Sequence, residues 1–208
     1  MARMNPVERR DNIVDAALSV MLSKGMAATT VRDVADQMGT SSGLIHHYFA
    51  SMDDLLAAAF DRAASQDLEA TREAMTKGAG PVERLTIFFG TYTRAEQDWA
   101  FQLWLDAWAE ATRRPAVQAT SQRLNVAWQQ LLVEAIYAGI ETKVMTCPDP
   151  EGAAWRILSL LDGLALQTVA HRAAVARDSV IPWSVAHAEG ELGLSPGALL
   201  GSPSELIG

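Results

Sequence analysis

The chain has 208 residues, of which 49% are hydrophobic and 20% are charged, and its formal net charge is −8. This length accommodates one small and one medium domain with a buried core, and the composition excludes an intrinsically disordered protein. The single cysteine, Cys147, excludes an internal disulfide and is typical of a reducing compartment.

Neither an export signal nor a membrane span is predicted. The N-terminus is polar, and Asp15 and Ser19 interrupt the apolar run that follows it, unlike the apolar core of a signal peptide. The most apolar region, residues 157–170, contains Asp162 and Gln167, so it is too polar to cross a bilayer. We therefore expect a cytoplasmic protein.

The first predicted helix begins near Pro6, because proline is favoured at a first helical position, and it ends near Gly25. One face of this helix is apolar and should support the next two helices; it carries Ile13, Ala17, Val20 and Met21. Three arginines, Arg3, Arg9 and Arg10, lie at its start. They could reach a nucleic-acid backbone or minor groove, or they could be ordinary solvated charges.

Residues 29–49 have the pattern of two short helices joined by a tight turn. Thr30 and Asp33 form a capping signal that starts the first helix, and Gly39 can end it in a left-handed conformation. The apolar face of this helix consists of Val31, Val34, Ala35 and Met38. Ser42 is predicted to cap the second helix, in which Leu44 and Ile45 are apolar anchors.

The outer face of the second helix is small and polar, as a helix end that enters a DNA major groove requires. It comprises Thr40, Ser41, Ser42, Gly43, His46 and His47. A helix-turn-helix is the favoured interpretation. The alternative is a pair of packed helices in an all-α protein, since caps and glycines would look similar there.

The segment TVRDVADQMGTSSGLIHHYF resembles the DNA-binding motif of the TetR family of bacterial transcriptional regulators, and GLIHHYF most resembles the BetI-type, choline-responsive branch. The resemblance implies an all-α homodimer with an N-terminal three-helix DNA-binding domain and a C-terminal helical domain for ligand binding and dimerisation. One departure is Met52, which stands where the family usually carries a lysine near a phosphate.

By their place in the motif, eight residues are assigned to DNA: Thr30, Thr40, Ser41, Ser42, Gly43, His46, His47 and Tyr48. The resemblance assigns Ser42 and His46 to base edges, and Thr30, His47 and Tyr48 to phosphates. Residues 1–50 hold five basic and five acidic side chains, so the remainder of the chain carries the whole −8. The predicted DNA-binding head, residues 1–50, is thus neutral overall, and its basic side chains can still bind phosphates locally.

A long helix is predicted from residue 52 to about 77, opened by a capping signal of Ser51 with Asp54 and followed by a Gly-Ala-Gly-Pro break. Further helices are predicted at about 81–95, 96–112, 115–141, 150–175 and 179–191. We divide the chain into a DNA-binding domain (1–50), a regulatory and dimerisation domain (51–195, with 52–77 as linking helix) and a flexible tail (196–208).

Tryptophans gather in the predicted regulatory domain. Phe101, Trp104 and Trp108 share one helical face, and together with Trp128 they could line a pocket for a small organic effector, cationic or aromatic. Stripes at this spacing are also typical of ordinary core packing.

The helix predicted at 150–175 is apolar nearly all round, as in a helix buried on two sides. The resemblance places a dimer interface on it, for which we name Ile157, Leu160, Leu161 and Leu164. Asp162 and Gln167 in this setting need polar partners, either across the dimer or on a ligand.

Nothing in the sequence indicates an enzyme, a cofactor or a metal site. His46 and His47 are adjacent and point different ways on a helix, His171 and His187 are isolated, and Cys147 precedes a proline. The sequence therefore predicts a ligand-responsive transcriptional regulator that represses from a palindromic operator. The competing hypotheses are an all-α protein-binding or scaffolding module and, more weakly supported, a helical enzyme.

Overall fold

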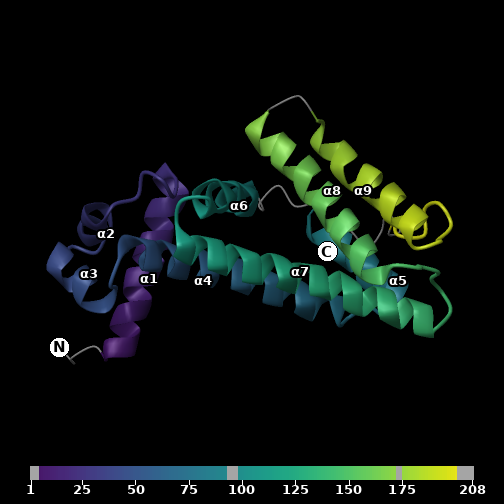
Figure 1. The fold of residues 1–208 in the computed structure, drawn as a ribbon, viewed down its shortest axis with the longest axis horizontal. Helices are drawn as coiled ribbons and strands as arrows, with labels where there is room; N and C mark the ends of the chain where they lie inside the picture. Colours follow the sequence, from purple (N-terminus) through teal and green to yellow (C-terminus); the bar gives the residue numbers. More distant parts are fainter. Residues whose placement is uncertain (1–4, 93–97, 172–174, 201–208) are drawn as a thin grey trace. The chain divides into compact units, whose positions relative to one another are not determined.

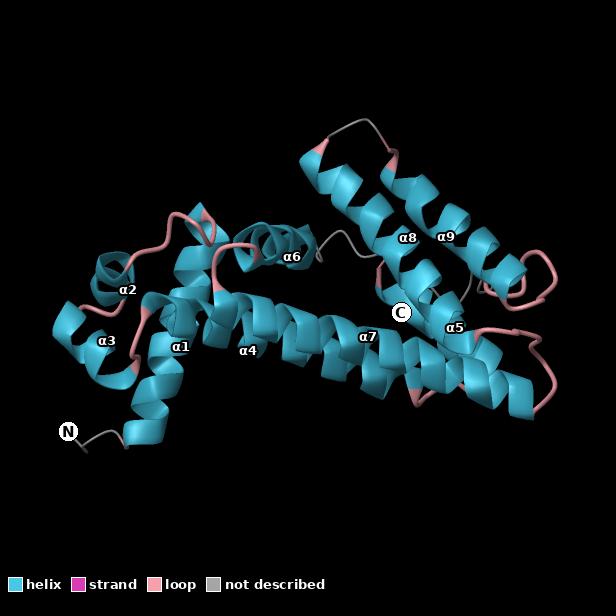
Figure 2. Cartoon of the chain, viewed as in Figure 1, coloured by secondary structure: helices cyan, strands magenta, loops and turns pink. Residues whose placement is uncertain are grey.

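The computed structural model describes residues 5–92, 98–171 and 175–200. These residues form helices and no strand, which confirms the predicted all-α fold (Figure 2). The helices are α1 (Pro6–Lys24), α2 (Val31–Gln37), α3 (Ser42–Tyr48), α4 (Met52–Met75), α5 (Pro81–Thr91), α6 (Asp98–Ala111), α7 (Pro115–Glu141), α8 (Pro150–Ala170) and α9 (Arg177–Glu191) (Figure 1).

The chain divides into two compact units. The first comprises Met1–Gln66 and Gln102–Leu124, and the second comprises Asp67–Phe101 and Asn125–Gly208. Helices α4, α6 and α7 therefore each contribute residues to both units. This division differs from the boundary predicted at residue 50, because the first unit recruits distant helices whose apolar faces complete its core.

The core of the first unit gathers side chains from six helices. It includes Ile13, Ala17, Val34, Ile45, Leu55, Phe60, Leu103 and Leu124. At the start of α1, Pro6 occupies the predicted first helical position, and the side chain of Asn5 accepts the amide hydrogen of Val7 at 2.7 Å. Gly25, with φ of +87°, ends this helix as predicted.

In the second unit, α8 and α9 lie side by side (Figure 1). Arg156 on α8 pairs with Glu191 on α9 through an Nη2–Oε2 distance of 2.7 Å. The sequence predicts a flexible tail from residue 196, but the structure holds its first residues. The buried carboxylate of Glu189 accepts the amide hydrogens of Gly197 at 3.0 Å and Leu199 at 2.9 Å, and the Leu199 side chain is buried. Residues 201–208 lie outside the described part.

Two helices end earlier than the sequence predicts. α5 ends at Thr91, where the amide of Tyr92 donates to the Phe89 carbonyl at 3.2 Å, and α8 ends at Ala170. The remaining predicted helical residues at 93–95 and 172–174 fall outside the described part.

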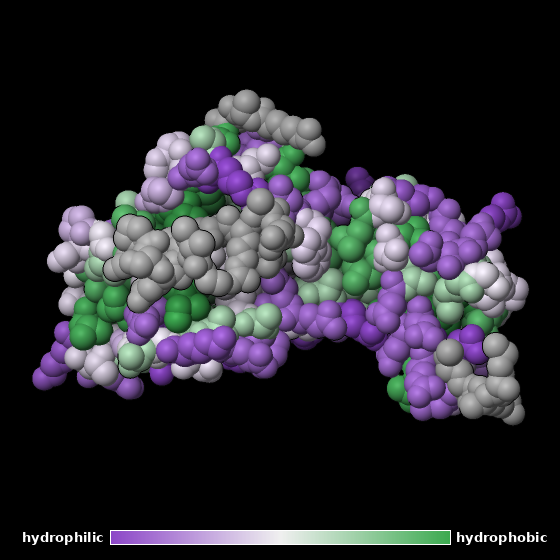
Figure 3. Space-filling model, turned by 180° about the vertical axis from the view of Figure 1, so that it is seen from behind, coloured by the Kyte–Doolittle hydropathy of each residue, from purple (hydrophilic) through white to green (hydrophobic). Residues whose placement is uncertain are grey.

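No helix within the described ranges is long and apolar enough to cross a membrane. In the space-filling view, apolar side chains form separate patches between hydrophilic ones (Figure 3).

Candidate nucleic-acid interface and aromatic cluster

The turn between α2 and α3 is built by local hydrogen bonds. Thr30 and Asp33 form the predicted capping box at the start of α2. Gly39 adopts φ of +62°, as predicted, and the Thr40 amide donates to the Ala35 carbonyl at 2.9 Å. The N-cap of α3 is Ser41, not the predicted Ser42, which is the first helical residue. The Ser41 side chain makes no capping hydrogen bond, so its hydroxyl is not used by the helix.

One face of α3 is packed and the other is presented to solvent. Ile45 is 2% exposed and lies in the core, and Phe49 directly after the helix is also buried. The predicted DNA residues that are exposed are Thr30, Ser41, Gly43, His46 and His47, whereas Thr40, Ser42 and Tyr48 are half-buried. The fold thus places the short polar side chains of α3 on one accessible surface.

Three of these residues, Thr30, His47 and Tyr48, already interact with neighbours. The Thr30 hydroxyl donates to Asp33 Oδ2 at 2.5 Å, and the Lys24 ammonium lies 2.7 Å from Asp33 Oδ1. The hydrogen bond from Lys24, followed by those from Thr30, lowers the pKa of Asp33 to about 2. The rings of His47 and Tyr48 meet edge to face with centroids 5.2 Å apart. A phosphate at Thr30 would therefore lie close to a carboxylate that stays ionised.

Arg10 has a packing role that sequence spacing did not indicate. Its guanidinium lies over the Phe49 ring, 4.7 Å from the centroid, and so connects α1 to the end of α3. Arg9 is half-buried, Arg32 on α2 is exposed, and Arg3 lies outside the described residues.

The start of α4 lacks the family's lysine. Met52 is half-buried and packs against the core of the first unit. Ser51 accepts the Asp54 amide hydrogen at 3.1 Å, as the predicted cap requires. Asp53 forms an ion pair with Arg114, whose Nε also donates to Glu110 at 2.6 Å. The charge of Arg114 is therefore shared between two carboxylates.

α6 contributes to both units, and the four predicted pocket residues are divided between the units. Trp104 packs edge to face on Phe60 at 4.9 Å between centroids and lies 6.0 Å from Trp108, all within the first unit. Phe101 and Trp128 belong to the second unit. Each pair therefore packs within its own unit, and a single wall of all four residues stays a prediction.

Tyr92, which follows α5, lies among three aromatic residues of the second unit. Its ring centroid is 5.5 Å from Phe88, 5.8 Å from Phe101 and 6.3 Å from Trp128. We call Phe88, Tyr92, Phe101 and Trp128 the aromatic cluster. The indole Nε1 of Trp128 is buried and has no hydrogen-bond partner among the described residues. Because buried donors are normally paired, this N–H can serve a bound acceptor.

Two carboxylates accompany the aromatic cluster. The Tyr92 hydroxyl donates a hydrogen bond to Asp162 on α8, and burial raises the pKa of Asp162 to about 7 despite that bond. Burial also raises the pKa of Asp67. The pKa of the Tyr92 phenol is raised mainly by burial and, to a smaller extent, by the charges of Asp162 and Asp67. A cation would offset this negative charge, and aromatic faces also attract cations.

The predicted dimer residues divide into two groups. Ile157 and Leu161 are buried within the protomer, whereas Leu160 and Leu164 are half-buried. Two further tryptophans of these helices were not assigned to the interface from the sequence: Trp155 on α8 and Trp183 on α9, which are 41% and 55% exposed. Exposure of large aromatic side chains could only be read from the packed fold.

Gln167 is exposed, and its Oε1 lies 2.8 Å from His171 Nδ1, so it needs no partner across a dimer.

Comparisons with known proteins agree with this architecture. Residues 13–59 match the family described as bacterial regulatory proteins, tetR family, and residues 81–193 match the family described as BetI-type transcriptional repressor, C-terminal. The chain belongs to the TetR family of transcriptional regulators. Its second half is of the BetI type. These families consist of transcriptional regulators, not enzymes, as the sequence predicts.

Individual relatives point the same way. The chain is 32% identical over 168 residues to the HTH-type transcriptional regulator BetI of Rhizobium meliloti, which covers 79% of each chain. It is 27% identical over 164 residues to the regulator CymR of Pseudomonas putida, covering 78% of this chain and 80% of that one. A putative regulator from Pseudomonas aeruginosa PAO1 superposes with a TM-score of 0.78 at 25% identity, covering 91% and 92% of the two chains.

Proposed function

We propose that this protein is a homodimeric, cytoplasmic repressor that binds a palindromic operator and leaves it when a small organic cation binds. The observation that carries the DNA-binding part is the exposed polar face of α3, set opposite the buried Ile45. Ser42 and His46 are proposed to read base edges, and Thr30, His47 and Tyr48 to contact phosphates, with Thr40, Ser41 and Gly43 allowing close approach. Two-fold symmetry would set the two recognition helices ~34–36 Å apart.

The proposed effector site is the aromatic cluster with Asp162. Ring faces can each contribute ~0.5–2 kcal/mol to binding a cation. The carboxylates of Asp162 and Asp67 supply negative charge, and the unpaired Trp128 N–H supports an effector with a hydrogen-bond acceptor as well. Phe101 and Trp128 thus keep the effector role predicted for them. We propose that Trp104 and Trp108 do not contact the effector. They would instead pack α6 within the first unit, so that a shift of α6 is passed on to the DNA-binding head.

Choline is the first probe to use. A putative regulator from Saccharomonospora viridis was solved in complex with choline; this chain shares its fold with a TM-score of 0.79 at 23% identity, covering 89% of this chain and 98% of that one. Choline combines a quaternary ammonium with a hydroxyl, which fits a site that offers aromatic faces, carboxylates and one N–H donor.

α6 offers a route from effector to DNA. It carries Phe101 in the second unit and Asp106 in the first, where the Asp106 carboxylate holds the loop between α1 and α2. An effector that binds more tightly to one position of α6 would change the population of DNA-competent heads. A coupling of about 1–3 kcal/mol would already weaken DNA binding several-fold.

The proposed dimer contact uses the exposed side of α8 and α9. Leu160 and Leu164 line it on α8, and the exposed Trp183 on α9 is an additional candidate. Ile157 and Leu161 would support this face from within the protomer. A Leu164→Asp variant should sediment as a monomer, and a variant that remains a dimer would count against this contact.

Salt dependence tests the DNA-binding proposal. A palindromic duplex selected from a random pool should bind with log affinity falling linearly with log salt, with a slope of about −0.9 per phosphate neutralised. The Ser42→Ala and His46→Ala variants should lose preference for that duplex. If affinity is independent of salt and of sequence, the helix-turn-helix is a protein-binding surface and the regulator proposal is wrong.

A further inference from the structure

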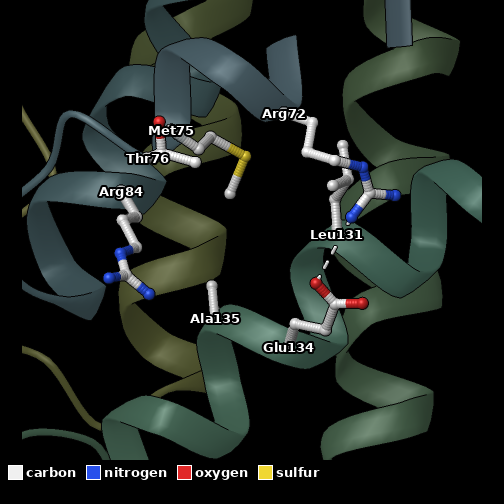
Figure 4. A pocket seen from close by; sticks show the side chains of 7 residues that line it. All are labelled: Arg72, Met75, Thr76, Arg84, Leu131, Glu134 and Ala135. Atoms are coloured by element: carbon white, nitrogen blue, oxygen red, sulfur yellow. Dashed lines mark ion pairs between the residues drawn. The ribbon is translucent and has the colours of Figure 1, made fainter. Parts of the chain in front are cut away.

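A cavity lies in the second unit, and none of its lining residues belongs to the aromatic cluster. It has a volume of about 170 Å³ and is bordered by the end of α4, the start of α5 and the middle of α7 (Figure 4). Its lining consists of Arg72, Met75, Thr76, Arg84, Leu131, Glu134 and Ala135. Since a water molecule takes up ~30 Å³ in the liquid, this space matches roughly five or six waters, so a ligand must be small.

The inner side of the cavity is apolar and the rim is charged. Met75, Leu131 and Ala135 are each buried, so a ligand resting on them would lose apolar surface from water. Figure 4 shows the guanidinium groups of Arg72 and Arg84 on opposite sides of the cavity. The lining therefore combines an apolar surface with two permanent positive charges.

Both arginines are loosely held. Arg72 lies 3.5 Å from Glu134 and 3.6 Å from Glu69, both longer than the ~2.7–2.9 Å of a charge-assisted hydrogen bond. Arg84 donates through Nε to the Gly78 carbonyl at 3.5 Å. By contrast, Arg62 and Arg123 each reach a carboxylate at 2.6 Å. The two cavity arginines thus retain donor capacity toward a ligand.

The charge balance indicates what kind of ligand fits. The lining residues comprise two positive charges, Arg72 and Arg84, and one negative charge, Glu134, while Glu69 outside the lining also lies 3.6 Å from Arg72. Two guanidinium groups beside an apolar surface favour an anion with an apolar body over a cation. Thr76 adds little, because its hydroxyl already donates to the Glu73 carbonyl at 2.6 Å. Guanidinium groups bind carboxylates with matching planar geometry.

We propose that this cavity is a second ligand site that takes a small monocarboxylate with a compact apolar body. The carboxylate binds between Arg72 and Arg84, and the apolar body lies on Met75, Leu131 and Ala135. This site does not depend on the cation proposal, since the two share no residue and take ligands of opposite charge.

Titration of the full-length protein with benzoate, and with its neutral analogue benzamide, tests this site by calorimetry. Benzoate should bind at one site per chain. Benzamide should bind with at least about tenfold lower affinity, because it cannot form a charge-assisted pair with arginine. Equal binding of the two compounds would overturn the proposal, as would no binding of benzoate.

Three variants locate the site. Arg84→Gln removes one guanidinium from the exposed rim, and Ala135→Leu fills the space above the apolar surface. Each variant should lower the affinity for benzoate by about tenfold. Arg113→Gln is the matched control, since Arg113 is 71% exposed in its side chain and lies outside the lining. An unchanged affinity in Arg84→Gln, or an equal loss in Arg113→Gln, would mean that benzoate binds by general attraction to surface arginines.

Discussion

The carboxylate of Asp106 accepts the backbone amide hydrogen of Met26 at 3.0 Å, which joins α6 to the loop between α1 and α2. Met26 is fully buried, so no water replaces this acceptor. The same carboxylate accepts from Gln102 at 3.1 Å, and a Cβ at Gly25 would approach it to 3.3 Å. α6 therefore holds the DNA-binding head through one specific polar contact.

Replacing Asp106 should separate this contact from simple packing. Asp106→Ala leaves the buried Met26 amide without an acceptor and should cost about 1–3 kcal/mol of unfolding free energy in urea titrations. Asp106→Asn keeps a carbonyl acceptor and should cost less. Equal losses in the two variants would show that the carboxylate charge, not the hydrogen bond, is what matters.

Substitutions on α3 should sort into two kinds. His47→Ala removes a proposed phosphate contact and should weaken operator and random DNA about equally, with a shallower salt slope. His46→Ala removes a proposed base contact and should cost about 1–3 kcal/mol on the operator alone. Competition binding against random duplex measures both. Selective loss in His47→Ala would contradict its assignment to the backbone.

The missing lysine at the start of α4 can be restored. Met52→Lys places a cation in the first turn of a helix proposed to face DNA, so it should strengthen binding to all sequences and steepen the salt slope by about 0.9. Met52 is only half-buried, so the lysine stem can lie along the same apolar surface. An unchanged slope in salt titrations would place this helix end away from phosphate.

The half-buried Asp162 makes stability depend on pH. Its pKa is raised to about 7, above the value of an unfolded chain, so the folded state holds the extra proton between about pH 4 and 7. Unfolding free energy should therefore fall as pH rises through that window, by about 1–2 kcal/mol after solvent screening. Asp67, whose pKa is also raised, acts in the same direction.

Urea unfolding at about pH 5 and about pH 7.5 checks this dependence. The side chain at position 162 stays neutral at both pH values in Asp162→Asn. The unfolding free energy of this variant should therefore change less with pH than that of the parent protein, and the remaining change is due to Asp67. An unfolding free energy of the parent protein that rises between these two pH values would contradict the raised pKa of Asp162.

The parts of the fold that the sequence predicted are those specified by neighbouring residues. The Thr30 and Asp33 cap, the left-handed Gly39 and the start of α1 at Pro6 each depend on signals within three or four positions. The cap of α3 was misplaced by one residue, because Ser41 and Ser42 are chemically equal candidates and only the backbone distinguishes them.

Contacts between distant segments could not be predicted. Helical spacing put Phe101 and Trp104 on one face of α6 but could not show that Phe101 packs on Tyr92 and Trp104 on Phe60. The bond between Tyr92 and Asp162 joins the residue that follows α5 to α8, and only the packed fold shows it. For the same reason, the sequence indicated that Asp162 needs a polar partner but could not show that this partner is Tyr92, and it gave no sign of Asp67.

Release of operator DNA by a cation shows directly whether this protein is a cation-responsive regulator. Fluorescence anisotropy of the labelled operator complex should be followed at about pH 8, where Asp162 is ionised, during titration with choline and with its neutral analogue carrying carbon in place of the ammonium nitrogen. We expect choline to release the DNA and the neutral analogue to leave it bound. The Asp162→Asn variant should still bind operator but should no longer respond to choline. Release by both compounds, or by neither, would contradict a cation-responsive regulator.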